Sequence, residues 1–321
     1  MKQAQFEQQF STDWHWLEDQ FAVLEKLRPG EAAQDPRLAR LPASYRRLCH
    51  HQALARERGY SISLIQRLDD LVLRGYRLLY RPRLPIAAPL KQFFLADFPR
   101  AVRAQWPWQL ASALVFCLSM VLLWALVRQQ PEMIYALVDA ETAQQLEDMY
   151  HPEATHRSER DSNDDVVMFG YYIYNNISIA FRTFAGGIFF GIGALFVMLF
   201  NGSFFGAIAA HLTNTGMHEP FFTFVVAHGA PELTAIVLAG GAGLRLGWAL
   251  LAPGPWTRLD ALRKSAGEAM PIMYGAFALL VLAAFIEAFW SPRLFDPWIK
   301  YSVGCVLWTL LFGYLFAGGR R

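Results

Sequence analysis

The spacing of the hydrophobic residues changes near residue 107. Before that point, apolar residues recur every three or four positions, which is the pattern of one buried face on an amphipathic helix. After it they form long runs, and the first of these, at 108–127, has twenty residues without a charge. A helix needs about 20 apolar residues to cross the hydrocarbon core of a bilayer. The pattern therefore predicts a water-exposed helical domain at 1–107 and a transmembrane domain at 108–321.

The domain at 1–107 has the pattern of three amphipathic helices. The first carries a stripe of large apolar residues and ends before residue 30, the second covers 43–58, and the third covers 61–80. Three such helices can bury their stripes against one another as a small bundle. The stretch 89–103 mixes Phe and Leu with Lys and Arg, which favours an interfacial helix at the membrane surface. A fourth helix of the bundle is the alternative for this stretch.

About six helices are expected to cross the membrane, so the predicted fold class is all-α, a polytopic α-helical membrane protein. The least regular piece is 203–229, which is apolar only in its first part and which we expect to be broken or re-entrant. The expected spans lie near 108–127, 172–200, 203–229, 232–251, 272–290 and 299–317.

The distribution of charge indicates the orientation of the spans. Residues 1–107 carry 17 Lys and Arg against 11 Asp and Glu, whereas the loop at 128–170 carries ten acids and three arginines. Positive residues near spans concentrate in cytoplasmic segments. With six spans, both termini then lie in the cytoplasm and 128–170 is extracytoplasmic, with a helix at 131–150 resting on the outer surface. We expect a multi-pass protein of the bacterial cytoplasmic (inner) membrane.

The composition excludes several classes of protein. The chain is 54% hydrophobic and 17% charged, which is too apolar for a disordered or fully solvated protein. Lys and Arg number 29 and Asp and Glu 27, so the basic excess typical of a nucleic-acid binder is missing. The three cysteines fall in the expected cytoplasmic domain or inside spans, where disulfides are not expected. Membrane lipid, and no nucleic acid, is the expected partner.

A few polar and small residues fall inside the apolar runs. Ionisable side chains at membrane depth are costly and usually face a protein interior or a water-filled cavity, so these positions are candidates for a polar cluster. Small residues at four-residue steps let helix backbones approach closely in lipid. The candidates for the polar cluster are Asn175, Asn176, Arg182, Asn201, His228, Gly229, Glu232, Arg245 and Glu287. The candidates for helix packing are Gly187, Gly191, Gly202, Gly206, Ala239 and Gly243.

Several short motifs follow one another between residues 166 and 292. They are, in order, Asn175-Asn176, Gly187-Ile188-x-x-Gly191, Asn201-Gly202-x-x-x-Gly206, His228-Gly229-x-x-Glu232, Ala239-Gly240-Gly241-Ala242-Gly243 and Ile286-Glu287-x-Phe289-x-Ser291-Pro292. In this order they resemble the stage II sporulation protein M family of multi-pass membrane proteins. Members usually have Pro directly before the His-Gly pair, whereas this chain has Ala227 there and Pro231 inside the motif.

The resemblance implies a non-catalytic integral membrane scaffold or complex subunit of the cell envelope. In spore formers it implies work with peptidoglycan-remodelling partners, and elsewhere an association with MoxR-type AAA+ ATPases and von Willebrand A-type proteins. The basic helical domain at 1–107 would then be the docking surface for a cytoplasmic partner. We also expect a homo-oligomer, with a dimer as the first expectation.

The segment from His228 to Glu232 is expected to break the helix at membrane depth. It contains Gly229 and Pro231 beside two ionisable groups, and broken backbone in a bilayer is tolerated where it is buried in protein or lines a cavity. A contact between His228 and Glu232, or pairing of Glu232 with Arg182 or Arg245, would offset the cost of desolvation.

Three uses of this segment remain open at the level of sequence. It can be a polar knot that fixes the bundle, a conduit or ligand site, or a metal site in which His211 or Glu287 joins His228 and Glu232. Because metal sites usually need three or more protein ligands, we expect no metal and no cofactor. A broken helix with midplane charges would also suit a small-solute or ion transporter or channel, which is the alternative function. Neither Gly-x-Ser-x-Gly nor His-Glu-x-x-His occurs, so no enzyme is expected.

Overall fold

The computed structural model describes residues 1–26, 35–80, 87–151 and 162–320. Every regular element in these ranges is a helix, which confirms the predicted all-α fold class. The chain divides into two compact units, Met1–Lys91 and Gln92–Arg321. Each unit has its own hydrophobic core.

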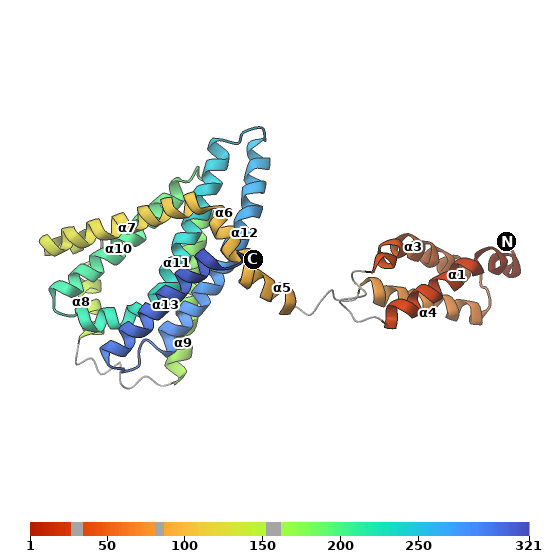
Figure 1. Cartoon of the computed structure of the whole chain (residues 1–321), viewed down its shortest axis with the longest axis horizontal. Helices are drawn as coiled ribbons and strands as arrows, with labels where there is room; N and C mark the ends of the chain where they lie inside the picture. Colours follow the sequence, from red (N-terminus) through yellow and green to blue (C-terminus); the bar gives the residue numbers. More distant parts are fainter. Residues whose placement is uncertain (27–34, 81–86, 152–161, 321) are drawn as a thin grey trace. The chain divides into compact units, whose positions relative to one another are not determined.

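The first unit contains α1 (Gln3–Lys26), α3 (Pro36–Glu57) and α4 (Ile62–Leu79), coloured red to orange in Figure 1. The large apolar side chains of the predicted stripes meet in one core. α3 begins earlier than the predicted residue 43, because Asp35 caps it by accepting a hydrogen bond of 2.9 Å from the backbone N–H of Arg37. Pro36 then occupies the first turn, where a missing N–H costs nothing.

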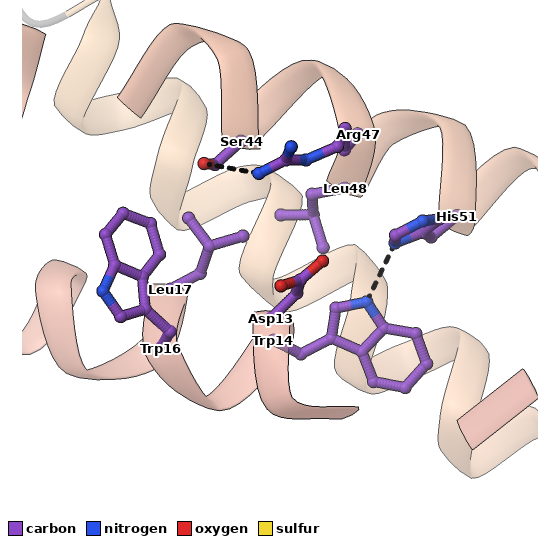
Figure 2. Close-up of a pocket in the computed structure, with 8 residues that line it drawn as sticks. All are labelled: Asp13, Trp14, Trp16, Leu17, Ser44, Arg47, Leu48 and His51. Carbon is purple, nitrogen blue, oxygen red and sulfur yellow. Dashed lines mark hydrogen bonds between the residues drawn. The ribbon is translucent and has the colours of Figure 1, made fainter. Parts of the chain in front are cut away.

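Polar contacts fix how these three helices lie against one another. Figure 2 shows Trp14 of α1 beside His51 of α3, where the indole Nε1–H donates to His51 Nδ1 at 3.2 Å. Arg67 of α4 donates to Glu18 of α1 at 3.0 Å, from Nε to Oε1. This hydrogen bond to the guanidinium lowers the pKa of the Glu18 carboxyl.

The second unit begins before the first apolar run. A short helical segment, η1 (Phe93–Asp97) and α6 (Phe98–Ala104), packs against α12 (Arg258–Phe289) and α13 (Pro297–Ala317). The ring of Phe98 fills the space beside Gly275, where a Cβ would lie 2.0 Å from that ring. The unit boundary therefore lies at residue 92 rather than at the expected 107, because Phe98 is buried and Phe93 half-buried against the later helices.

Six long helices follow one another in the second unit (Figure 1). They are α7 (Trp106–Gln129), α9 (Ser162–Gly186), α10 (Ile192–Asn214), α11 (His218–Leu251), α12 and α13. Five of these helices are long and apolar enough to cross a membrane. α9 is not among the five, although it has 25 residues, because it carries Asn175, Asn176 and Arg182.

The expected span at 172–200 is two helices. α9 ends at Gly186, the chain reverses over 187–191, and α10 begins at Ile192. Gly191 adopts a left-handed conformation with φ of 85°, which an L side chain rarely tolerates. Gly187 lies against the backbone of α11, where a Cβ would sit 2.1 Å from the carbonyl oxygen of Gly243. Apolar residues continue through this reversal, so hydropathy alone did not show where the chain turns from α9 to α10.

The expected break at 228–232 does not occur. α10 runs to Asn214, and after a short turn α11 is one helix of 34 residues that includes Pro231. The pieces expected at 203–229 and 232–251 therefore belong to α10 and to a single α11. A proline inside a membrane helix is tolerated where neighbouring helices support the freed backbone. Ala227, Ala230 and Pro231 are buried in such contacts.

Small residues let the helices of this unit approach closely. Gly202 and Gly206 of α10 lie against α7, where added Cβ atoms would sit 2.5 Å from the Phe116 carbonyl oxygen and 2.1 Å from that of Met120. Figure 1 shows α7 and α10 side by side along this contact. Ala239 of α11 is fully buried in the core.

Between α7 and α9, the predicted helix at 131–150 is two shorter ones. A 3₁₀ turn, η2 (Pro131–Ala136), precedes α8 (Ala140–Tyr150). Asp139 separates them, because its carboxylate accepts from the backbone N–H of Thr142 at 2.8 Å and caps α8. Ile134 and Ala143 pack on α10 near its C-terminal end.

Candidate functional site

Five of the nine polar candidates line one cavity of about 640 Å³ in the second unit. We call it the polar groove and define it by Asn175, Asn176, Arg182, Asn201 and Glu232. These residues come from α9, α10 and α11, so the groove forms only when three helices pack together. Its remaining walls are apolar and mainly aromatic: Phe116, Ile179, Phe196, Val197, Phe200, Phe204, Phe205, Leu233 and Ile236.

The asparagines of the groove are held by local hydrogen bonds. Asn175 donates from Nδ2 to Asn176 Oδ1 at 2.9 Å, and Asn176 is buried with 3% exposure. Asn201 donates from Nδ2 to the carbonyl oxygen of Val197 at 2.7 Å, one turn earlier in α10. Asn175 and Arg182 are exposed on the surface of the unit, whereas Glu232 is partly buried. The groove is therefore open at α9 and closed at α11.

At its α11 wall the groove adjoins a second polar cluster, which we call the His-Glu-Glu cluster: His228, Glu232 and Glu287. His228 and Glu232 lie one turn apart on α11, with His228 Nε2 4.0 Å from Glu232 Oε2. Glu287 comes from α12, and one ligand atom from each of the three residues lies within 4.8 Å of the other two. His228 is 5% exposed. Glu232 is the residue that the groove and the cluster share.

A segment after α12 supports the His-Glu-Glu cluster. His228 Nδ1 lies 3.0 Å from the hydroxyl of Ser291, which is itself buried. The ammonium of Lys300, at the start of α13, donates to the carbonyl oxygen of Ser291 at 2.8 Å. The ring of Phe224 packs edge-on against the imidazole, with centroids 5.2 Å apart. These contacts give His228 a fixed ring orientation.

Three residues considered for this cluster do not take part in it. Arg245 forms an ion pair with Glu268 of α12, at the end of α11 far from Glu232. His211 pairs with Glu147 of α8 at 2.8 Å. Gly229 lies within the continuous α11, where only a Val225 side-chain atom would come within 4 Å of an added Cβ. The pairing of Glu232 with Arg245 and the use of His211 as a ligand are therefore wrong.

Sequence reasoning missed two buried polar side chains near the site. Lys300 is 7% exposed and was available as a candidate, because an ionisable residue stood inside the expected span at 299–317. Ser112 of α7 donates to the carbonyl oxygen of Val237 in α11 at 2.7 Å. A serine in an apolar run is common in membrane helices, so no pattern in the sequence distinguished it.

Comparison with known proteins finds a match in each of the two units. A sequence model described as "Stage II sporulation protein M" matches residues 112–292, which is more than half of the chain. A second model, described as "Domain of unknown function (DUF8413)", matches residues 4–81. An uncharacterized protein of Methanocaldococcus jannaschii is 25% identical over 132 residues, which cover 39% of this chain and 72% of that protein. No solved structure matches the chain significantly.

Proposed function

Because the chain belongs to the stage II sporulation protein M family, we propose that it is a non-catalytic membrane scaffold, a subunit of a complex in the cell envelope. Membership of the family makes it a multi-pass membrane protein, in agreement with its five long apolar helices. The proposal adds the role: the second unit anchors the chain in the bacterial inner membrane, and the first unit recruits a partner in the cytoplasm.

The division into two compact units is the observation that carries this proposal. The first unit has its own core, and large side chains such as Ile62, Tyr76 and Tyr80 remain exposed on its surface. The second unit is held by backbone-to-backbone contacts at glycines, which favours a rigid anchor. A rigid anchor joined to an independent helical unit suits the assembly of a protein complex better than catalytic turnover.

Partners of three kinds fit this arrangement. MoxR-type AAA+ ATPases and von Willebrand A-type proteins would meet the first unit in the cytoplasm, and peptidoglycan-remodelling proteins would meet the loop at 128–170 outside. We also propose a homodimer, since Asn175 and Arg182 are exposed on α9. Polar side chains at membrane depth are costly in contact with lipid, and a second copy would cover them.

The transport alternative has lost its main support. It rested on a broken helix at 228–232, and α11 runs through these residues without interruption.

Binding of purified components tests the scaffold role. A MoxR-type ATPase of the same organism should bind the full chain in nanodiscs at a fixed stoichiometry, and the particle mass reports whether the chain is a dimer. Reversing two exposed charges, Arg46→Glu with Arg77→Glu, should weaken this binding at least tenfold, because it removes positive charge from the first unit. Lys264→Glu, an exposed charge reversal in α12, is the matched control and should leave binding unchanged.

Flux measurements test the transport alternative. The protein in liposomes should pass neither ions nor small solutes above the level of empty liposomes. A flux that Glu232→Gln abolishes would contradict the scaffold proposal, as would a failure of all three partner classes to bind.

A further inference from the structure

The His-Glu-Glu cluster brings three metal-ligand side chains together from two helices. We propose that His228, Glu232 and Glu287 bind one divalent transition-metal ion, which joins α11 to α12 inside the membrane unit. This inference goes beyond the scaffold role, since it holds whether or not a cytoplasmic partner binds.

The helix backbones already place the three ligand residues beside one another, so the backbone does not have to move. Residues four apart on a helix lie on the same face, so His228 and Glu232 both point at α12 from consecutive turns of α11. Glu287 faces them from the last turns of α12, and their ligand atoms lie within 4.8 Å of one another. Ligand atoms around a tetrahedral ion at about 2.1 Å are about 3.4 Å apart, so rotation of the two glutamate side chains is enough to close the site.

Ser291 holds the imidazole in the orientation that a metal requires. A histidine that binds metal through Nε2 carries its proton on Nδ1 and commonly donates it to an oxygen atom. His228 Nδ1 lies 3.0 Å from Ser291 Oγ, and the carbonyl oxygen of Ser291 accepts from Lys300. Nε2 is then the nitrogen that faces the carboxylates, with Glu232 Oε2 4.0 Å away. This supporting contact is a second observation, independent of the three ligands.

A positive centre would stabilise the convergence of these atoms. An imidazole lone pair and two carboxylates that face one another in a poorly solvated site repel unless something positive lies between them. A metal ion supplies that charge at the point where all three meet. A proton on one carboxyl group, or the ammonium of Lys300, is the competing source of positive charge. A cluster neutralised in either way would not bind an added metal ion.

The donor set indicates the class of metal. One imidazole and two carboxylates, without a thiolate, suit Zn²⁺, Mn²⁺ or Fe²⁺ better than Cu⁺. Three protein ligands leave at least one coordination position unfilled, and Glu232 also lines the polar groove. Water from the groove would complete the coordination sphere.

Metal content and metal affinity test the proposal directly. The full chain would be purified in detergent, stripped with a chelator, and loaded in turn with Zn²⁺, Mn²⁺ and Fe²⁺, and metal per chain measured by mass spectrometry. We expect about one tightly held ion per chain for at least one of these metals. Loading with Co²⁺ should give the visible absorption of a low-symmetry cobalt site. A chain that retains none of these metals would overturn the proposal, whatever the variants do.

Variants then assign the ion to these residues. His228→Ala and Glu287→Gln should each abolish stoichiometric binding. Ser291→Ala should weaken affinity about 10–100-fold, the usual effect of losing a partner that orients a ligand. His211→Ala is the matched control, because His211 also pairs with a glutamate in this unit, and it should bind metal like the unaltered protein. Binding that survives both His228→Ala and Glu287→Gln would place the ion elsewhere and refute the assignment.

Discussion

Individual polar side chains in the membrane unit are explained by partners that lie far away in the sequence. Arg245 meets Glu268, and Lys300 reaches the carbonyl oxygen of Ser291 beside His228. Burying a polar group without a partner costs free energy, so each such pair has to form together with the helix contact that buries it. The identity of these residues marked them as candidates, and their partners depend on how the helices pack.

At the same scale, His51 makes the stability of the first unit sensitive to pH. Its burial lowers the pKa of the imidazole, against an opposing effect from Asp13 and with help from His50 and Arg47. The Trp14 N–H also donates to Nδ1, which requires that nitrogen to be unprotonated (Figure 2). As the pH falls below about 6.5, the unfolded chain binds a proton at His51 before the folded chain does, so folding becomes less favourable.

Hydrogen exchange measures this effect in the full chain. The opening free energy of amides in α1 and α3, corrected for intrinsic exchange, should be lower at pH 5 than at pH 7.5. Glu18 and Asp69 also have lowered pKa values, held by Arg67 and by Gln52 with Arg56, but they act mainly below about pH 4.5. His51→Gln cannot titrate and should remove most of the difference. If the opening free energy falls as much between pH 7.5 and pH 5 in the His51→Gln variant as in the unaltered protein, another group causes the effect.

At the scale of elements, the length and polarity of the apolar runs did not show where the membrane helices begin and end. The run at 172–200 contains a full reversal, because Gly191 accepts a left-handed conformation and Gly187 fits against Gly243. The segment at 228–232 contains Gly229 and Pro231 and remains helical. Helix signals in the sequence are weak priors, and packing against neighbouring helices overrides them.

The contact between α7 and α10 gives a prediction about these elements. Gly206→Ala would place a Cβ 2.1 Å from the Met120 carbonyl oxygen, and backbone cannot move aside as a flexible side chain can. We expect a loss of about 1–3 kcal/mol of stability, the usual cost of overpacking. Thermal unfolding of the protein in detergent measures it.

Gly313→Ala in α13 is the matched control. A Cβ there has no atom within 4 Å, so the same substitution should be neutral or slightly stabilising, since Ala favours the helix over Gly. If both variants unfold at the same temperature, the close approach of α7 and α10 is wrong.

At the scale of the molecule, the two ends of the membrane unit lie together. Arg103 of α6 donates to the carbonyl oxygen of Leu315 at 2.7 Å and to that of Gly318, so the start of α7 adjoins the end of α13. A chain whose ends lie on one side crosses a membrane an even number of times. Five helices are apolar enough to cross. We therefore propose that α9, whose polar side chains line the groove, is a sixth crossing.

Cysteine labelling tests the orientation that follows from this count. Cys49 should resist an impermeant maleimide added to intact cells and react after permeabilisation, in a chain where Cys117 and Cys305 are replaced by Ala. Gln144→Cys, at an exposed position of α8, should react from outside and serves as the control. Labelling of Cys49 in intact cells would reverse the predicted orientation.

The sequence by itself determined the class of protein, the amphipathic helices of the first unit and the polar positions of the membrane unit. These follow from the free energy of transfer to lipid and from helical periodicity, which are properties of neighbouring residues. The motif order also sufficed for the family, which the match over 112–292 confirms.

Only the tertiary structure decided where α9 turns into α10, that α11 continues through Pro231, and that His228, Glu232 and Glu287 meet while Arg245 and His211 pair elsewhere. These features depend on distances between residues that are far apart in the sequence. Within a bilayer the hydrophobic effect does not choose among helix partners, so close packing of small residues and the pairing of polar groups decide which helices meet.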